Sequence, residues 1–197
     1  MDTLNETEEA RSADAALLAR YAAGDVAAAR ILSARFAPRV YAHAHRVLGN
    51  VAEAEDVTQE AMVRLWKQAP RWEAGRAQAS TWLYRVTANL CTDRLRRVPD
   101  TPLDTIAAPE DPAPSAVDRL QAAAREDALQ AALMRLPERQ RQAVVLRHLE
   151  GLANTEIAEI LGIGTEAVES LTARGKRALS ADLAQQREAL GYEDDRT

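Results

Sequence analysis

Residues 154–173, NTEIAEILGIGTEAVESLTA, decide the fold class of this chain of 197 residues. Gly162 stands where a tight turn between two helices requires a positive φ, which glycine adopts without steric penalty. Apolar residues recur on both sides of the turn at the spacing of buried helix faces: Ile157, Leu161, Ile163, Val168 and Leu171. The pattern predicts a helix-turn-helix with helices at about 155–161 and 165–184. An ordinary helical hairpin with a solvated face is the alternative interpretation.

The exposed face of the second predicted helix carries small, polar and basic side chains. The candidates for contact with nucleic acid on this face are Ser170, Ala173, Arg174 and Arg177, and Thr165 suits the first turn of the helix. Such side chains can reach base edges and phosphates when the helix lies in a DNA major groove. Glu166 and Glu169 would repel phosphate, so they fit only if they face cytosine edges or point away from the groove.

The remainder of the chain is also predicted to be helical, because alanine is abundant and no segment shows the alternation of a strand. Helical patterns occupy residues 14–97 and 119–187, and Asp14 is expected to cap the first helix. Between them, residues 98–118 hold five of the eight prolines, five acidic residues and no basic residue, which indicates a linker. The predicted fold class is all-α: two small helical domains joined by a flexible, acidic, proline-rich linker, with a C-terminal helix-turn-helix.

The distribution of charge permits a nucleic-acid partner although the formal net charge is −5. Acidic residues concentrate in the two tails and the linker. Residues 14–99 contain 13 basic and 8 acidic residues, so the first folded block is basic. An overall acidic composition therefore does not argue against nucleic-acid binding.

Several classes of protein are excluded by composition. No run approaches 18 apolar residues, and the acidic N-terminus lacks the apolar stretch of a secretory signal. Cys91 is the only cysteine, which excludes a disulfide framework. His43 and His45 are two residues apart, so on a helix they point roughly 200° apart and cannot hold one metal ion. We expect a cytoplasmic protein with no cofactor, no metal site and no enzymatic activity.

The segment STWLYRVTANLCTDRLRR, residues 80–97, predicts a helix with one polar face. Arg85, Asn89, Thr92 and Arg96 share that face, with Asp93 beside them. Trp82 lies at its edge, and Trp72 in the preceding loop could lie nearby. An aromatic ring, an amide and guanidinium groups suit a single-stranded base and its backbone. Arg94, Arg96 and Arg97 would form a phosphate site at the helix end. The alternative is a core tryptophan beside a solvated, arginine-rich face.

A further helix, at about residues 52–68, is amphipathic. Its polar side carries Glu53, Asp56, Glu60, Arg64 and Lys67, with Gln59 and Val63 at the margin. We expect this face to have no role within the chain. Taken alone, it is an ordinary solvated helix face.

Four stretches, taken in order, give the chain its resemblance to a known family. They are AEAEDVTQEAMVRLWKQAPRW, ASTWLYRVTANLCTDRLRR, LPERQRQAVVLRHLEGL and NTEIAEILGIGTEAVESLTARGKRAL. Together they resemble the bacterial RNA polymerase sigma factors of the extracytoplasmic-function (ECF) group. The match covers about residues 14–97 and 119–184.

The resemblance implies site residues and partners. Those implied for polymerase binding are Asp56, Gln59, Glu60, Arg64 and Trp66. Those implied for the minus-ten element are Trp72, Trp82, Arg85, Asn89, Asp93, Arg94 and Arg97, and residues 72–80 resemble the loop that captures a flipped base. Those implied for the minus-thirty-five element are Thr165, Ser170, Ala173, Arg174 and Arg177. The implied partners are core RNA polymerase (its beta-prime clamp helices and beta subunit), promoter DNA and an anti-sigma factor, without insertion into a membrane.

Two departures from the family pattern stand out. In the second of the four stretches, Ala79 stands where the family motif begins with a phenylalanine. The second helix of the predicted helix-turn-helix carries Glu169, Leu171 and Gly175, where many relatives are more basic. Two alternatives remain. A stand-alone helix-turn-helix regulator would not explain the helix at residues 80–97 with its tryptophan, asparagine and arginines. A sigma-like decoy would need a domain that receives a partner, and the sequence shows none.

Overall fold

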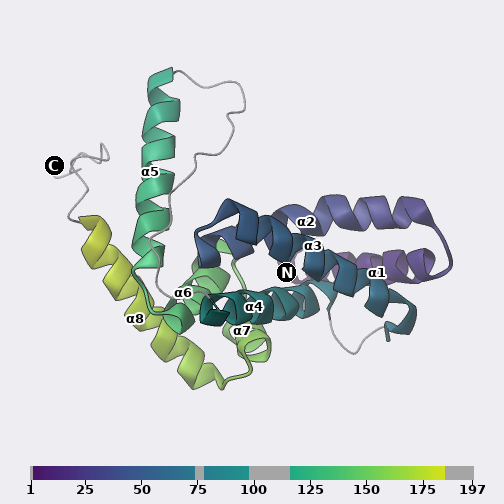
Figure 1. Cartoon of the computed structure of the whole chain (residues 1–197). Helices are drawn as coiled ribbons and strands as arrows, with labels where there is room; N and C mark the ends of the chain where they lie inside the picture. The colour runs from purple at the N-terminus through teal and green to yellow at the C-terminus, as the bar shows by residue number, and fades with distance from the viewer. Residues whose placement is uncertain (1, 74–77, 98–115, 185–197) are drawn as a thin grey trace.

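The computed structural model of the chain describes residues 2–73, 78–97 and 116–184, and this part contains helices and no strand (Figure 1). The elements are α1 (Asp2–Ala22), α2 (Val26–Leu48), α3 (Val51–Gln68), the 3₁₀ turn η1 (Ala69–Arg71), α4 (Ala79–Arg97), α5 (Ala116–Met134), α6 (Glu138–Val144), the π-helical turn η2 (Val145–Leu149), α7 (Asn154–Leu161) and α8 (Thr165–Ala184). The predicted all-α fold class is confirmed. Most of the predicted linker, residues 98–115, lies outside the described residues, as do residues 74–77 of the predicted loop.

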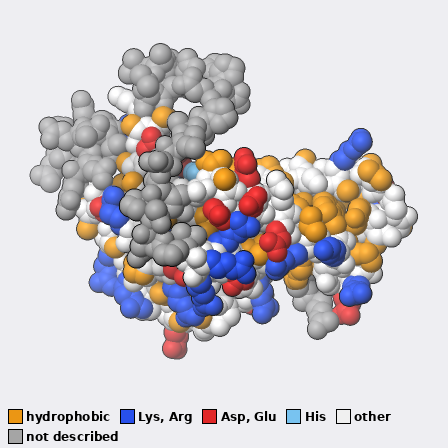
Figure 2. All heavy atoms as spheres, in the orientation of Figure 1, with side chains coloured by type: hydrophobic (Ala, Val, Ile, Leu, Met, Phe, Trp, Pro, Cys, Tyr) orange, Lys and Arg blue, Asp and Glu red, His pale blue; other side chains and the backbone are white. Residues whose placement is uncertain are grey.

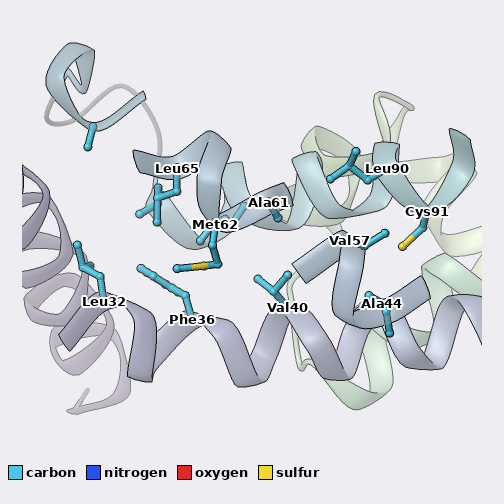
Figure 3. Close-up of a cluster of buried hydrophobic side chains, with 14 of the residues drawn as sticks. Leu32, Phe36, Val40, Ala44, Val57, Ala61, Met62, Leu65, Leu90 and Cys91 are labelled. Atoms are coloured by element: carbon cyan, nitrogen blue, oxygen red, sulfur yellow. The ribbon is translucent and has the colours of Figure 1, made fainter. Parts of the chain in front are cut away.

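The N-terminal half is a bundle of α1 to α4 around one apolar core. Figure 3 shows side chains of α2, among them Phe36, facing Met62 and Leu65 of α3, while Leu90 of α4 covers the same core. Phe36 and Leu65 are almost completely buried. Full burial of such a side chain stabilises the fold by about 1.5–3 kcal/mol.

Caps determine where α2 and α3 begin and end. The Asp25 carboxylate accepts hydrogen bonds from the backbone N–H groups of Ala27 and Ala28, and the Asn50 side chain accepts one from Glu53. Gly49 ends α2 in the left-handed conformation, with φ of 69°. These side chains and this glycine satisfy backbone groups that a helix leaves without partners at its ends.

The expected cap at Asp14 is wrong, because α1 already begins at Asp2. Asp14 lies inside α1, where its carboxylate forms an ion pair with Arg35 of α2. The Asp14 carboxylate therefore pairs with a cation on the neighbouring helix instead of capping its own. The two residues are 21 positions apart, so local spacing does not indicate this pair.

The C-terminal half contains the predicted helix-turn-helix, formed by α7 and α8. Gly162 ends α7 with φ of 63°, which confirms the predicted turn. The buried stripe of α8 consists of Val168, Thr172, Gly175 and Leu179, whereas Leu171 is only half-buried. A Cβ atom on Gly175 would lie 2.5 Å from Cγ2 of Val144, so this glycine allows α8 to approach α6 closely.

The two halves pack on each other through α4, which contacts α2 and α3 on one side and α7 on the other (Figure 1). Tyr84 and Ala88 of α4 belong to the same apolar cluster as Ile157 and Val168 of the helix-turn-helix. Within the described part of the chain, no helix is both long and apolar enough to span a membrane.

Candidate nucleic-acid interface

The outer face of α8 presents all the residues predicted to contact the minus-thirty-five element. Thr165, Ser170, Ala173, Arg174 and Arg177 are all exposed. The last four lie on the side of α8 opposite the buried stripe, whereas Thr165 is the first residue of the helix. Figure 2 shows Lys and Arg side chains gathered over the part of the surface where α7 and α8 lie in Figure 1. The guanidinium Nε atoms of Arg174 and Arg177 donate to carbonyls one turn earlier in α8, at 3.2 and 3.3 Å. Both side chains therefore lie along an exposed helix face.

Glu169 lies toward α7. Its carboxylate faces Nδ2 of Asn154 at 3.5 Å, across the start of α7. This contact orients the Glu169 carboxylate toward the start of α7.

Trp72 and Trp82 form a second part of the site. Their rings meet edge to face, with centroids 5.9 Å apart and planes at 84°. They line an open cavity of about 610 Å³ together with Arg71, Arg85 and Glu159 of α7. Both tryptophans are half-buried and also pack against the N-terminal core. Trp82 therefore packs on the core, as the interpretation of a core tryptophan expects. It also lines the cavity, as a tryptophan that stacks on a base would.

A different cavity, of about 480 Å³, lies between α4 and the C-terminal half. Asn89, Thr92, Asp93 and Arg96 contribute to its α4 wall. The predicted minus-ten residues are therefore divided: the tryptophans and Arg85 line one cavity, and the Asn89 group lines the next along the helix. Arg97 is exposed in the last turn of α4.

Arg94 occupies a third position, facing α3. It forms ion pairs with Glu53 and, at 3.3 Å, with Asp56. The hydrogen bond that Arg94 donates to the Glu53 carboxylate raises the pKa of Arg94, so the guanidinium stays charged within this network. Arg94 joins two helices of the N-terminal half, a role that the sequence analysis did not anticipate.

The charged face of α3 also has partners within the chain. Asp56 pairs with Arg94, and Glu60 pairs with Arg64 one turn along the helix. The expectation that this face has no role within the chain is therefore wrong. Asp56 and Gln59 are nevertheless exposed, and Val63 is 46% exposed on the same face. Val63, which the sequence analysis placed at the margin, completes a surface with one apolar residue among charged ones.

Trp66, the fifth residue predicted for polymerase binding, is half-buried. Its ring lies 4.9 Å from that of Tyr21 in α1, centroid to centroid. The side chain therefore packs between α3 and α1 and holds this helix in place, and its role in polymerase binding stays a prediction.

Two groups with possible chemistry are buried. Burial lowers the pKa of His43 to about 4 and raises the pKa of Cys91 to about 12, so the imidazole is neutral and the thiol protonated at neutral pH. His45 stacks on Tyr41 at 5.8 Å. Among the described residues, no group of His, Cys, Asp and Glu could hold a metal ion.

Comparisons with known proteins identify both halves. A family model described as Sigma-70 region 2 matches residues 32–98, and one described as Sigma-70, region 4 matches residues 126–179. The ECF RNA polymerase sigma factor SigW of Bacillus subtilis is 34% identical over 163 residues, which cover 74% of this chain and 83% of that protein. Two solved structures are also similar. CnrH, solved in complex with the cytosolic domain of CnrY, is 28% identical with a TM-score of 0.65, over 88% of this chain and 98% of that one. RpoE of Bartonella quintana, solved with the anti-sigma factor NepR, has a TM-score of 0.64 and 19% identity, over 79% and 96%.

Proposed function

The chain belongs to the ECF group of RNA polymerase sigma factors, and we propose that three separate surfaces carry out its part in promoter recognition. Proteins of this family are transcription initiation factors that direct RNA polymerase to promoters. In the proposal, residues 14–97 bind core polymerase and the minus-ten element, residues 119–187 bind the minus-thirty-five element, and residues 98–118 connect them. The extents of the two family matches support this division.

The outer face of α8 is assigned to the minus-thirty-five element. The observation that carries the proposal is that Ser170, Ala173, Arg174 and Arg177 are exposed together, opposite the buried stripe that packs α8 on α6, and that Thr165 is exposed at the start of the helix. With α8 in the major groove, Ser170 and Arg174 would lie near base edges and Arg177 nearer the backbone. A bidentate contact from Arg174 to a guanine would be worth about 1–3 kcal/mol of discrimination.

The cavity beside Trp72 and Trp82 is assigned to an unstacked base of the minus-ten element. The two rings and Arg85 combine an apolar surface with a cation, which suits a base and its phosphate. Stacking on one aromatic ring contributes roughly 1–3 kcal/mol. Asn89 would pair with a base edge further along α4, and Arg97 would hold the backbone at the helix end.

The exposed face of α3 is assigned to the clamp helices of the polymerase beta-prime subunit. Asp56 is already paired with Arg94, but its carboxylate can still attract a partner because the side chain remains exposed. Val63 supplies an apolar contact at the centre of this face. An anti-sigma factor is a further proposed partner, supported by the complex in which the Bartonella quintana relative was solved.

The test is transcription in vitro from a library of promoter sequences, with core polymerase and the full-length chain. The proposal predicts initiation at a small set of promoters sharing two elements. The stand-alone regulator predicts tight binding of duplex DNA by the chain without polymerase and no initiation with it.

A further inference from the structure

We propose that the cavity of about 480 Å³ between α4 and the C-terminal half is a binding site for a free guanine nucleotide. Asn89 and Asp93 would bind the edge of the guanine base. Arg96 and Arg139 would hold its phosphates. The proposal goes beyond promoter recognition, because it concerns a small ligand that the chain binds without polymerase or DNA.

The cavity has the size of a small-ligand site. Clefts that bind small molecules typically enclose about 300–1,000 Å³, with a few polar groups beside an apolar wall. The lining residues of this cavity come from α3, α4, α6, α7 and α8. Because residues of α7 and α8 line it as well as those of α4, the space suits a single nucleotide better than a strand that continues along α4.

Apolar side chains of the helix-turn-helix form one part of the wall. They are Ile160, Leu161, Ile163 and Leu171. Ile160 is 2% exposed, whereas the other three are half-buried, although their spacing in the sequence predicts core positions. Apolar side chains that retain exposed area beside a cavity can cover the flat face of a heterocyclic base.

Four polar side chains at the cavity have no hydrogen bond or ion pair within the described part of the chain. They are Asn89, Asp93, Arg96 and Arg139, and all four are exposed. An amide, a carboxylate and two guanidinium groups from two helices are therefore available to a ligand.

The other charged groups at the cavity already have partners. Oε1 of Glu138 accepts a hydrogen bond from the Thr92 hydroxyl and another from Nε2 of Gln142. Arg64 pairs with Glu60. A ligand phosphate would therefore meet two unpaired guanidinium groups, while the carboxylate of Glu138 is held by its own hydrogen bonds.

The base preference follows from the pair on α4. Asn89 and Asp93 are four residues apart on this helix, so their side chains are neighbours on one face. The Watson–Crick edge of guanine presents the acceptor O6 beside two donors, the ring N–H and the amino group. A carboxylate accepts from both donors, while the Asn89 amide donates to O6. Adenine presents one donor and one acceptor there, and its acceptor would face the Asp93 carboxylate.

The two guanidinium groups suit the phosphates. Arg96 lies about one turn beyond Asp93 on α4, and Arg139 belongs to α6. Guanidinium groups bind phosphate oxygens through two parallel hydrogen bonds, which makes arginine the preferred residue for this task. One guanidinium from each of two helices at the same cavity matches a nucleoside diphosphate better than an uncharged nucleoside.

The test is isothermal titration calorimetry of the full chain without polymerase or DNA. The ligands are guanosine diphosphate, adenosine diphosphate and guanosine. We expect guanosine diphosphate to bind on the order of tenfold more tightly than adenosine diphosphate, because a bidentate base contact discriminates by about that factor. Guanosine should bind more weakly than its diphosphate, since it lacks the groups that the arginines hold.

Two variants separate the base contact from the phosphate contact. Asp93→Asn replaces two acceptors by one acceptor and one donor, so it should lower the affinity for guanosine diphosphate on the order of tenfold and raise the affinity for adenosine diphosphate. Arg139→Gln should weaken binding of both diphosphates and leave that of guanosine unchanged. The control Asp127→Asn makes the same change at an exposed position of α5 and should bind like the original chain. Circular dichroism checks that the variants are folded; a loss of folding alone would not reverse the base preference.

Equal affinities for the two diphosphates, or a base preference that Asp93→Asn leaves unchanged, would overturn the proposal. A guanine base also occurs in DNA, so a single-stranded oligonucleotide with one guanine is titrated in parallel. If the oligonucleotide depends on Asp93 and guanosine diphosphate does not bind, the cavity takes a DNA strand and the proposal is wrong. The titrations contain no polymerase, so their outcome is independent of whether the chain initiates transcription.

Discussion

Replacing Gly175 with alanine tests the packing that places the DNA-reading face of α8. Helix propensity alone predicts that this change stabilises the protein by about 1 kcal/mol, because glycine is unfavourable inside a helix. The structure predicts the opposite sign. The new Cβ would lie 2.5 Å from Cγ2 of Val144 and 3.3 Å from the backbone carbonyl oxygen of Gln140.

The magnitude follows from these two contacts. Val144 is 2% exposed and cannot swing into solvent, so α8 must move away from α6. Overpacking of this kind costs about 1–3 kcal/mol, and the middle of this range is about twice the gain in propensity. We therefore expect a net loss of about 1 kcal/mol in the free energy of unfolding, and weaker binding of the minus-thirty-five element because Arg174 shifts with α8.

The assay is urea unfolding of the full chain followed by circular dichroism. Ala178→Gly, at an exposed position of the same helix, calibrates the propensity term and should cost about 1 kcal/mol. An increase in stability of about 1 kcal/mol for Gly175→Ala would refute the close approach of the two helices.

Three further predictions concern the N-terminal half. Asn89→Ala should block promoter opening in a transcription assay while polymerase binding and the circular dichroism spectrum stay unchanged; a folded variant that opens promoters normally removes Asn89 from the site. Asp56→Arg should weaken binding to core polymerase, measured as affinity at two salt concentrations. The loss of the pair with Arg94 should also lower the free energy of unfolding by up to about 1 kcal/mol. Unchanged affinity would mean that the face is only solvated. Because the pKa of His43 falls from 6.5 to about 4 on folding, the unfolded chain binds the extra proton, so stability should be lost as pH falls from 6.5 toward 4, by about 1.4 kcal/mol per unit. His43→Leu should show a shallower slope in urea unfolding over that range, and an identical slope would contradict the buried neutral imidazole.

The helix-turn-helix was predictable because its signals are local. A glycine with a positive φ and apolar residues at helix spacing require no knowledge of the rest of the molecule, and Gly162 has the expected conformation. The exposure of Arg174 and Arg177 follows from the same spacing. Residues at fixed intervals on one helix can be assigned to faces before any tertiary contact is known.

The contacts that the sequence did not reveal join residues far apart in the chain. Asp14 pairs with Arg35, and Arg94 pairs with Glu53 and Asp56. Single-sequence patterns give the face of each residue but not which helix that face meets. Gly175 was interpreted as a missing basic residue, whereas it is a packing residue, because its meaning depends on how closely α6 approaches.

The contact between the two halves was missed for the same reason. Tyr84 and Ala88 stand on α4 at positions that suit the N-terminal core, and nothing local indicates that they complete the apolar cluster of another domain. Trp66 is a related case: its ring packs on Tyr21 of α1, a contact that the spacing along α3 does not indicate.

The most direct measurement of the central claim is a promoter-library transcription experiment with core polymerase that compares the original chain with Arg174→Ala and Arg177→Ala. If α8 reads the minus-thirty-five element through its exposed face, Arg174→Ala should weaken binding of this element by about 1–3 kcal/mol and relax the preference at one base. A side chain that contacts a base edge specifies the identity of that base. Arg177→Ala should weaken initiation evenly across sequences, as expected of a phosphate contact. Identical base preferences for the original chain and Arg174→Ala would contradict the assigned reading face.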